Sequence, residues 1–107
     1  MISTAEAQLL MRKWLSESAL LKIMFGCKEF GTDLFGHIES VSPEEVHFIL
    51  STGRLRLKLT DAEFGYAEPR EAAPMIREAE EQRSICQLKL WWPSGSVCFL
   101  FEQRTSR

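Results

Sequence analysis

Three basic residues alternate with three leucines in the segment RLRLKL, at positions 54–59. Successive side chains of a β-strand point to opposite faces, so Arg54, Arg56 and Lys58 would share one face of a strand. A row of cations of this kind can hold the phosphates of a nucleic-acid strand. The same alternation is also typical of the solvent side of a half-buried sheet. Single-stranded nucleic-acid binding through these three residues is therefore an alternative hypothesis for this chain.

The residue types that catalyse reactions do not fall into a recognised catalytic pattern. No glycine-rich phosphate loop, no G-x-S-x-G turn and no H-E-x-x-H sequence is present. The candidate carboxylates lie in predicted loops and at strand ends, where acidic side chains are usually just solvated; they are Glu29, Asp33, Glu39, Asp61 and Glu63. We therefore predict no catalytic residue and no cofactor. A small-molecule binder or enzyme with a pocket between helix and sheet is the second alternative.

The two histidines are the first residues to consider for a metal site. In the strand pairing predicted below, His37 and His47 are offset by about four residues, or ~13 Å at the rise of a strand. That separation is too large for a shared zinc ion, whose ligand bonds are about 2 Å long. Neither histidine has a cysteine at a recognised ligand spacing, so we predict no metal site.

Length, composition and charge narrow the classes of protein that fit. A chain of 107 residues is expected to form one domain with a core of its own. The formal net charge of −2 argues against a domain that binds nucleic acid over its whole surface. No apolar run approaches the ~20 residues of a membrane span, and the N-terminus lacks the pattern of a signal peptide. The odd number of cysteines, 3, fits a reducing compartment, so we expect a cytoplasmic protein without membrane contact.

The elements that must position these residues begin with a helix. Ser3 and Glu6 have the spacing of a capping box, in which each side chain satisfies a backbone N–H group of the other residue. An apolar stripe at helical spacing follows, formed by Ala7, Leu10, Met11 and Trp14. The pattern predicts an amphipathic helix within residues 1–18 that ends near Ser16 to Ser18 and packs on the sheet of its own domain.

A β-meander is predicted over residues 19–67, and a C-terminal hairpin over 85–103. The predicted strands are 19–25, 34–41, 46–50 and 55–59, and residues 64–66 either extend the last of these or form a fifth. Between meander and hairpin, residues 68–84 form a charged connection, with room for a short helix after Pro74. The predicted fold is α+β: one N-terminal helix packed on a curved, mainly antiparallel meander of five to seven strands, open or partly closed into a barrel.

The hydrophobic pattern also predicts how the strands pair, because a one-residue slip turns every side chain to the other face. For the third and fourth strands, we pair Leu50 with Leu55 across a loop at 51–54. For the second and third strands, we pair Ile38 with Leu50 across a loop at 43–45. Both pairings gather the apolar residues on one face and leave the charges of RLRLKL on the reverse face.

In the C-terminal hairpin, we pair Trp92 with Val97 across the loop at 93–96. This pairing keeps Cys86 and Cys98 out of disulfide reach of each other. It also produces a second face that is unusually apolar for contact with solvent, formed by Trp91, Lys89, Leu100 and Cys98. Either the helix covers this face or it is an interaction surface. Our leading hypothesis is a protein-interaction or self-associating structural module, whose partner is another protein or a second copy in a homo-oligomer.

The order of a helix followed by a bent antiparallel meander is similar, at the level of fold, to Sm-like and other small β-barrels. The Sm family carries a D-x-x-M-N type motif between its second and third strands. This chain reads ESVSPEEV over the corresponding residues, 39–46. The resemblance therefore implies a type of fold, and it transfers no RNA-binding residue to this sequence.

Overall fold

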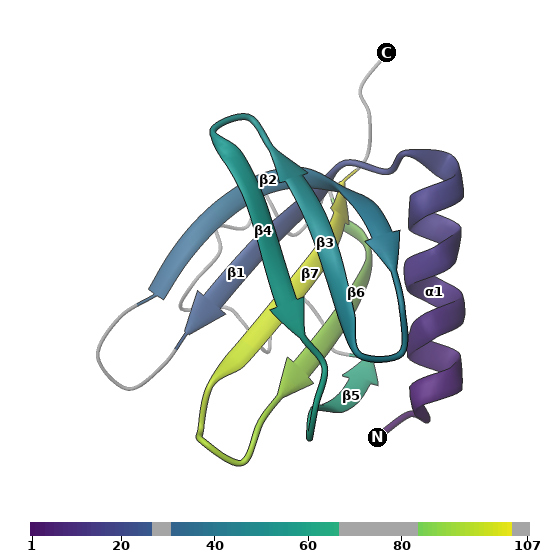
Figure 1. Cartoon of the computed structure of the whole chain (residues 1–107), viewed down its shortest axis with the longest axis vertical. Coiled ribbons are helices and arrows are strands. Elements are labelled where there is room, and N and C mark those ends of the chain that lie inside the picture. The colour runs from purple at the N-terminus through teal and green to yellow at the C-terminus, as the bar shows by residue number, and fades with distance from the viewer. Residues whose placement is uncertain (27–30, 67–83, 104–107) are drawn as a thin grey trace.

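The structure is a computed structural model that describes residues 1–26, 31–66 and 84–103. In this part of the chain it contains one helix and seven strands: α1 (Thr4–Glu17), β1 (Leu21–Gly26), β2 (Gly31–Val41), β3 (Glu45–Leu50), β4 (Gly53–Lys58), β5 (Glu63–Tyr66), β6 (Ser84–Trp91) and β7 (Val97–Gln103) (Figure 1). The predicted α+β class and the antiparallel meander are confirmed. The predicted charged connection lies outside the described residues, except Ser84, which begins β6.

Helix α1 begins and ends where the sequence indicates. The backbone N–H of Glu6 donates a hydrogen bond of 3.1 Å to Ser3 Oγ, and the Ser3 hydroxyl in turn lies 3.5 Å from the Glu6 carboxylate. At the other end, Ser18 takes a left-handed conformation with φ 50°, and its N–H donates to the Leu15 carbonyl at 3.2 Å. The bonds made by the N–H groups of Glu6 and Ser18 satisfy backbone groups that a helix end otherwise leaves unpaired.

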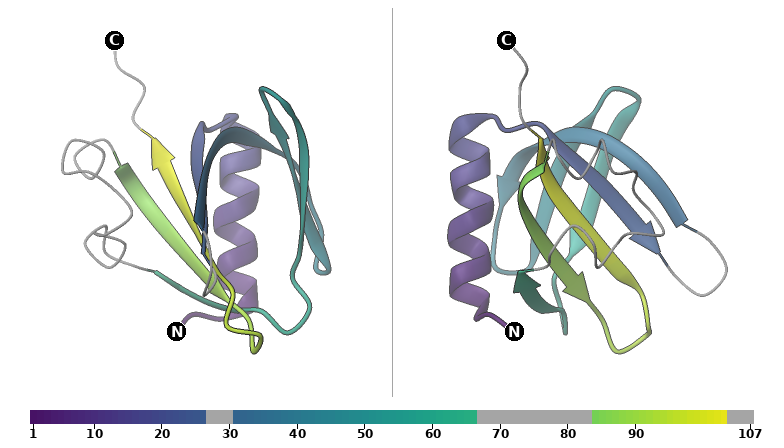
Figure 2. Two further views of the ribbon diagram at one scale, coloured as in Figure 1. Left: turned by 90° about the vertical axis from the view of Figure 1, so that its left-hand side faces the viewer. Right: turned by 180° about the vertical axis from the view of Figure 1, so that it is seen from behind.

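The strands form one antiparallel sheet in the order β4-β3-β2-β1-β7-β6-β5. Strand β1 lies in the middle, and its residues 21–24 are buried on both faces, as the continuous apolar run predicts. Strands β4 and β5 form the two edges although they follow each other in the chain, and the sheet is not closed between them. Figure 2 shows the sheet bent so that β6 and β7 lie across from β3 and β4, with α1 along one side.

The concave face of the bent sheet holds the main core. Helix α1 contacts β2 and β5 and contributes the buried side chains predicted from its stripe: Ala7, Met11 and Trp14. The sheet adds buried apolar side chains from each of its strands: Leu21, Ile23, Ile38, Val46, Phe48, Leu57, Phe64, Leu88, Leu90, Cys98 and Leu100. The predicted packing of the helix on its own sheet is therefore confirmed.

A second, smaller apolar cluster lies on the convex face of the central strands. Met24 of β1 packs there with Phe99 and Phe101 of β7. Beside it, the side chain of Lys22 is only 3% exposed, and its ammonium lies 3.9 Å from the carboxylate of Asp33. Apart from Lys22, the buried side chains on both faces of the central strands are apolar, which explains why hydrophobic alternation is weak in β1 and β7.

The pairing of β3 with β4 differs from the prediction by two residues. Leu50 pairs with Gly53 instead of Leu55, so the hairpin turns through Ser51 and Thr52 alone. Gly53 has φ 152°, a conformation that residues with a side chain rarely adopt. A shift of two residues keeps every side chain on its face, so the leucines of RLRLKL still point inward and its charges outward.

The pairing of β2 with β3 is also shifted by two residues. Ile38 pairs with Phe48, and Leu50 pairs with Gly36. A bulge at Glu39 then changes the register before the turn, so that Ser40 pairs with His47. The predicted pairing was wrong because the hydrophobic pattern is unchanged by a two-residue shift and does not detect a bulge.

The pairing of β6 with β7 in the C-terminal hairpin differs from the prediction by one residue. This shift exchanges the two faces of β7 relative to those of β6. Trp91, and not Trp92, pairs with Val97, and Leu90 pairs with Cys98. Trp92 leaves the strand and closes a longer turn, in which its N–H donates to the Ser96 carbonyl at 3.1 Å. The pattern could not identify this register because both faces of both strands carry large apolar residues.

Candidate functional site

The outer face of β3 and β4 carries the basic row of RLRLKL together with acidic side chains. Arg54 lies 3.4 Å from a carboxylate oxygen of Glu39. Arg56 Nε lies 3.5 Å from Oε2 of Glu45, and Oε1 of the same residue is 3.3 Å from His47 Nε2. The face is therefore charged but largely compensated, which weakens its attraction for phosphates.

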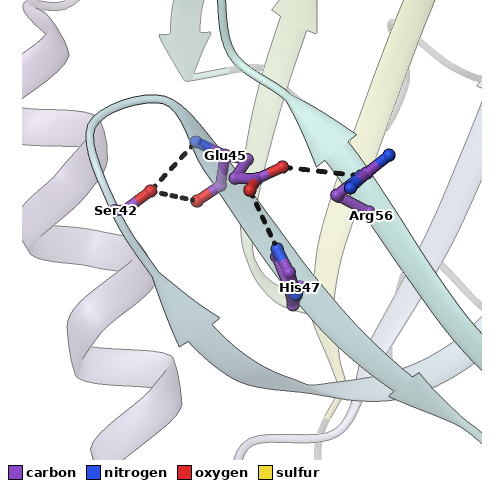
Figure 3. A network of polar contacts seen from close by, with 4 residues as sticks. All are labelled: Ser42, Glu45, His47 and Arg56. Atoms are coloured by element: carbon purple, nitrogen blue, oxygen red, sulfur yellow. Dashed lines mark hydrogen bonds and ion pairs between the residues drawn. The ribbon is translucent and has the colours of Figure 1, made fainter.

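Two hydrogen bonds between its backbone and the Ser42 side chain hold Glu45 in place. Its N–H donates a hydrogen bond to Ser42 Oγ at 3.2 Å, while the Ser42 hydroxyl donates to the Glu45 carbonyl at 3.1 Å. Figure 3 shows the resulting group, in which Glu45 lies between His47 and Arg56. The turn that precedes β3 thus positions the carboxylate that pairs with the middle cation of β4.

Lys58 differs from the two arginines of the row. Its strand neighbour across the ladder is Glu45, but the Glu45 carboxylate is directed at His47 and Arg56. Within residues 1–26, 31–66 and 84–103, no ion pair of Lys58 is present. The row therefore ends in a cation without a carboxylate partner in the described part of the chain.

The outer face of the C-terminal hairpin carries Trp91 in a fixed position. Its indole Nε1 donates a hydrogen bond of 2.6 Å to Glu63 of the adjacent edge strand. The ammonium of Lys89 lies 5.4 Å from the centre of the Trp91 ring and 5.8 Å from that of Phe99, within the range of cation–π attraction. The ring also passes close to Gly65, where an added Cβ would lie 3.3 Å from it. These contacts leave Trp91 little freedom to rotate.

The structure brings together only two of the four residues predicted for an interaction surface. Trp91 and Lys89 lie on the outer face. Leu100 and Cys98 were placed beside them wrongly, because the one-residue shift of the hairpin turns both into the core, where both are 0% exposed. Burial also raises the pKa of the Cys98 thiol far above its ordinary value, so the thiol stays neutral.

Two hollows flank the tip of the C-terminal hairpin. The outer one has a volume of about 400 Å³, and its lining includes Lys89, Trp91 and Phe99. The other has a volume of about 360 Å³ and lies where β1 and β4 end beside the hairpin turn. Its lining residues are Phe25, Gly26, Leu57, Lys58, Trp92, Ser94, Ser96 and Val97. No residue of α1 lines this second hollow, so it is not the pocket between helix and sheet that the sequence suggested.

The candidate catalytic carboxylates that the structure describes serve other contacts or stand alone. Asp33 lies near Lys22, Glu39 near Arg54 and Glu63 near Trp91. Asp61 is exposed in the connection before β5. Glu29 lies outside the described residues. Three of the described candidates thus contact a basic or indole group, which is a structural use of a carboxylate.

The two histidines make separate contacts in different parts of the sheet. His37 Nδ1 lies 3.0 Å from the carbonyl oxygens of both Ser18 and Ala19, where it can donate to the end of the helix. His47 lies beside Glu45. Across the described ranges, no group of three histidine, cysteine or acidic residues is placed to hold a metal ion.

The residue that sequence reasoning missed is Trp92. It was assigned to the strand, whereas it sits in the turn, packs against the main core and lines both hollows. Gly95 is the sequence feature that could have indicated a longer turn including Trp92. Glycine readily adopts a positive φ, and Gly95 has a φ of 95° in the observed turn.

Comparisons with protein-family models, with curated proteins and with solved structures find no match for this chain. In the portion of the chain that the structure covers, no helix is long and apolar enough to cross a membrane.

Proposed function

We propose that this chain is a protein-interaction module whose partner docks on the outer face of the C-terminal hairpin, around Trp91. The supporting observation is that Trp91 is held in place by Glu63 at 2.6 Å and by the ammonium of Lys89. Rigid, half-buried aromatic residues lose little conformational entropy when a partner covers them, and they are common centres of binding energy. The hollow of about 400 Å³ beside Trp91 offers room for a partner's side chain.

The two edges of the sheet are less suited to association than this face. Strand β4 carries Arg54, Arg56 and Lys58 along its outer face, and charged side chains on an edge strand discourage pairing with a further strand. Strand β5 has four residues, and the N–H of Ile2 already donates to its Phe64 carbonyl at 2.9 Å. Short, partly covered edges are poor templates for another strand.

A second copy of the chain is the first partner to test. Sedimentation velocity over a wide concentration range should show a reversible dimer for the wild type. Trp91→Asp should shift the protein to the monomer, because it removes the anchor and places a charge in the interface. Leu9→Asp is the matched control, since Leu9 is 69% exposed on α1, away from the hairpin. It should leave the dimer intact.

A monomeric wild type would exclude self-association and leave a different protein as the partner. A photo-crosslinking residue at position 93, in the exposed turn of the hairpin that carries Trp91, would then be used in an extract of the native host. Identical crosslinked products from the wild type and from Trp91→Asp would contradict the proposal. A cytoplasmic location, which the odd number of cysteines suggests, is part of this proposal.

Nucleic-acid binding through Arg54, Arg56 and Lys58 is the lesser candidate. It rests on the cationic row, and the carboxylates of Glu39 and Glu45 stand against it because they compensate both arginines. The third possibility, a small-molecule site, has a separate observation in its favour and is developed next.

A further inference from the structure

We propose that the hollow between the end of β4 and the C-terminal hairpin turn binds a small amphipathic carboxylate. This hollow differs from the outer one beside Trp91 because residues of β1 and β4 line it, although the two hollows share Trp92, Ser96 and Val97 of the hairpin. The ligand's apolar body would occupy the hollow, and its carboxylate would lie at Lys58. Five observations about the hollow carry the inference, and each concerns residues that the structure describes.

The volume of the hollow is about 360 Å³, which is near the lower end of the range for small-molecule sites in proteins. The body of the ligand must therefore be small. Most such sites combine a mainly apolar lining with a few polar groups that orient the ligand. The lining of this hollow likewise combines apolar side chains with a few polar ones.

The lining is apolar where it continues the main core. Phe25 and Trp92 pack against the core cluster, and Leu57 belongs to it with only 9% exposure. These three side chains come from β4, β1 and the hairpin turn, so the walls are attached to separate parts of the sheet. An aliphatic or aromatic body placed between them would be removed from water on several sides, which is the main source of affinity for an apolar ligand.

The polar groups of the hollow favour an anion. Lys58 is a lining residue, and unlike Arg54 and Arg56 it has no ion pair within the described residues. The carboxylate of Glu45, its neighbour across the ladder, is engaged with His47 and Arg56, so a ligand anion at Lys58 would break no existing ion pair of the described residues. The two arginines of the row are compensated, so the ligand's charge would be drawn to the end of the row that opens on the hollow.

The hairpin turn adds hydroxyl groups. Ser94 Oγ donates to Ser96 Oγ at 3.4 Å, and both residues line the hollow. Within the described residues this arrangement leaves the hydrogen of the Ser96 hydroxyl for an outside acceptor, such as a carboxylate oxygen. A neutral or cationic head group would gain less from Lys58, and a cation would be repelled by it.

The turn that carries these groups has a defined shape. The Gly95 N–H donates to the Trp92 carbonyl at 3.0 Å, and the Trp92 N–H donates to the Ser96 carbonyl at 3.1 Å. A turn closed by two such bonds keeps Trp92 and the serines in place before the ligand arrives. Preorganisation of this kind reduces the entropy lost on binding.

The test compares three probes that share one apolar chain: octanoate, octanol and octylamine. Backbone amide shifts of the isotope-labelled full chain, followed by NMR during titration, report both the affinity and the place of binding. We expect shifts at Leu57, Trp92 and Ser96, with octanoate binding more tightly than octanol and octylamine binding least. Shifts confined to Lys89 and Trp91, or no shift with any probe, would overturn the site.

Substitutions then separate the contribution of charge from that of shape. Lys58→Gln should weaken octanoate about threefold, the size expected for one partly exposed ion pair, and leave octanol unchanged. Arg54→Gln, at the other end of the same strand, is the matched control and should change neither. If Lys58→Gln lowered the affinities for octanoate and octanol equally, or left the affinity for octanoate unchanged, the proposed contact between Lys58 and the ligand's carboxylate would be wrong.

A third variant fills the hollow. Ser96→Phe places a ring in the turn and should abolish binding of octanoate and octanol alike, while an unchanged circular dichroism spectrum shows that the fold is retained. Undiminished binding by this variant would overturn the proposal. Trp91→Asp should leave octanoate binding intact, so a failure of this site and a failure of the outer interaction face are distinguishable.

Discussion

The indole Nε1 of Trp14 donates a hydrogen bond of 2.9 Å to Oε1 of Glu102, a residue 88 positions later in the chain. Trp14 is completely buried in α1, and Glu102 lies near the end of β7, opposite Leu21 of the central strand. This contact ties the N-terminal helix to the middle of the sheet by a specific polar bond. Helix and sheet are joined elsewhere mainly by apolar packing, which is less directional.

Removal of that bond should destabilise the protein measurably. Trp14→Phe keeps most of the apolar volume but leaves Glu102 without its donor, so we expect the free energy of unfolding to fall by about 1–3 kcal/mol. Glu102→Gln retains an acceptor oxygen and should cost less. Urea unfolding followed by far-ultraviolet circular dichroism measures both. Wild-type stability for Trp14→Phe would show that the hydrogen bond contributes nothing.

Gly36 is required by the close approach of two strands. It lies between Leu21 of β1 and Leu50 of β3, and an added Cβ would overlap the Ile49 carbonyl oxygen and lie 2.6 Å from Leu50 Cδ2. Gly36→Ala should therefore lower the free energy of unfolding by about 1–3 kcal/mol, although alanine is otherwise better than glycine in a strand. Thermal unfolding is the measurement. Ser40→Ala, in the exposed part of the same strand, is the control, and an equally small effect of both substitutions would contradict the steric argument.

Cys98 should behave as a buried, neutral thiol. Because burial raises its pKa, native protein at neutral pH should react with a thiol reagent at Cys98 only after unfolding. Mass spectrometry of the Cys98 peptide, with and without urea, measures this. Rapid labelling of the native protein at Cys98 would show that the residue is accessible.

The same pKa shift has a consequence for stability at high pH. The unfolded chain ionises this thiol above its ordinary pKa of 9.0, whereas the folded chain keeps it protonated. The contribution of Cys98 to the free energy of unfolding is therefore complete below that pKa and is lost as the pH rises above it. Cys98→Ala should be less stable at neutral pH, but its stability should fall less steeply above pH 9. Parallel pH profiles of the two proteins would contradict this.

The compensated basic row should bind nucleic acid weakly. Because Glu39 and Glu45 already face Arg54 and Arg56, we expect little retention of single-stranded RNA at physiological salt, measured by fluorescence anisotropy. A large signal at low salt that disappears in the Arg54→Glu, Arg56→Glu double variant would support the lesser candidate function after all. Equal anisotropy for the wild type and the double variant would remove that candidate.

Local features of this chain were predictable because the interactions that produce them span few residues. Ser3 and Glu6 locate the start of α1, and the apolar stripe locates its buried side. The alternation in RLRLKL assigns its leucines inward and its charges outward. A side chain's face depends only on the parity of its position in the strand, which survives a register shift of two residues.

The candidate sites depended on register, and register is a long-range property. In the C-terminal hairpin both faces are apolar, so the sequence pattern gives two pairings that differ by one residue. Which of them forms is decided by the turn around Gly95 and by the core that receives Leu88 and Leu90. In the observed pairing, Cys98 and Leu100 face the core, whereas Trp91 and Lys89 lie on the outer face.

The sequence by itself determined one helix on an antiparallel meander and the faces of the amphipathic strands, because these follow from short-range periodicity. Only the tertiary structure decided which cations meet carboxylates and that Lys58 opens on a hollow formed with the distant Trp92. Those residues belong to separate strands, and their meeting depends on how the whole sheet bends around its core. Sequence periodicity does not encode that curvature.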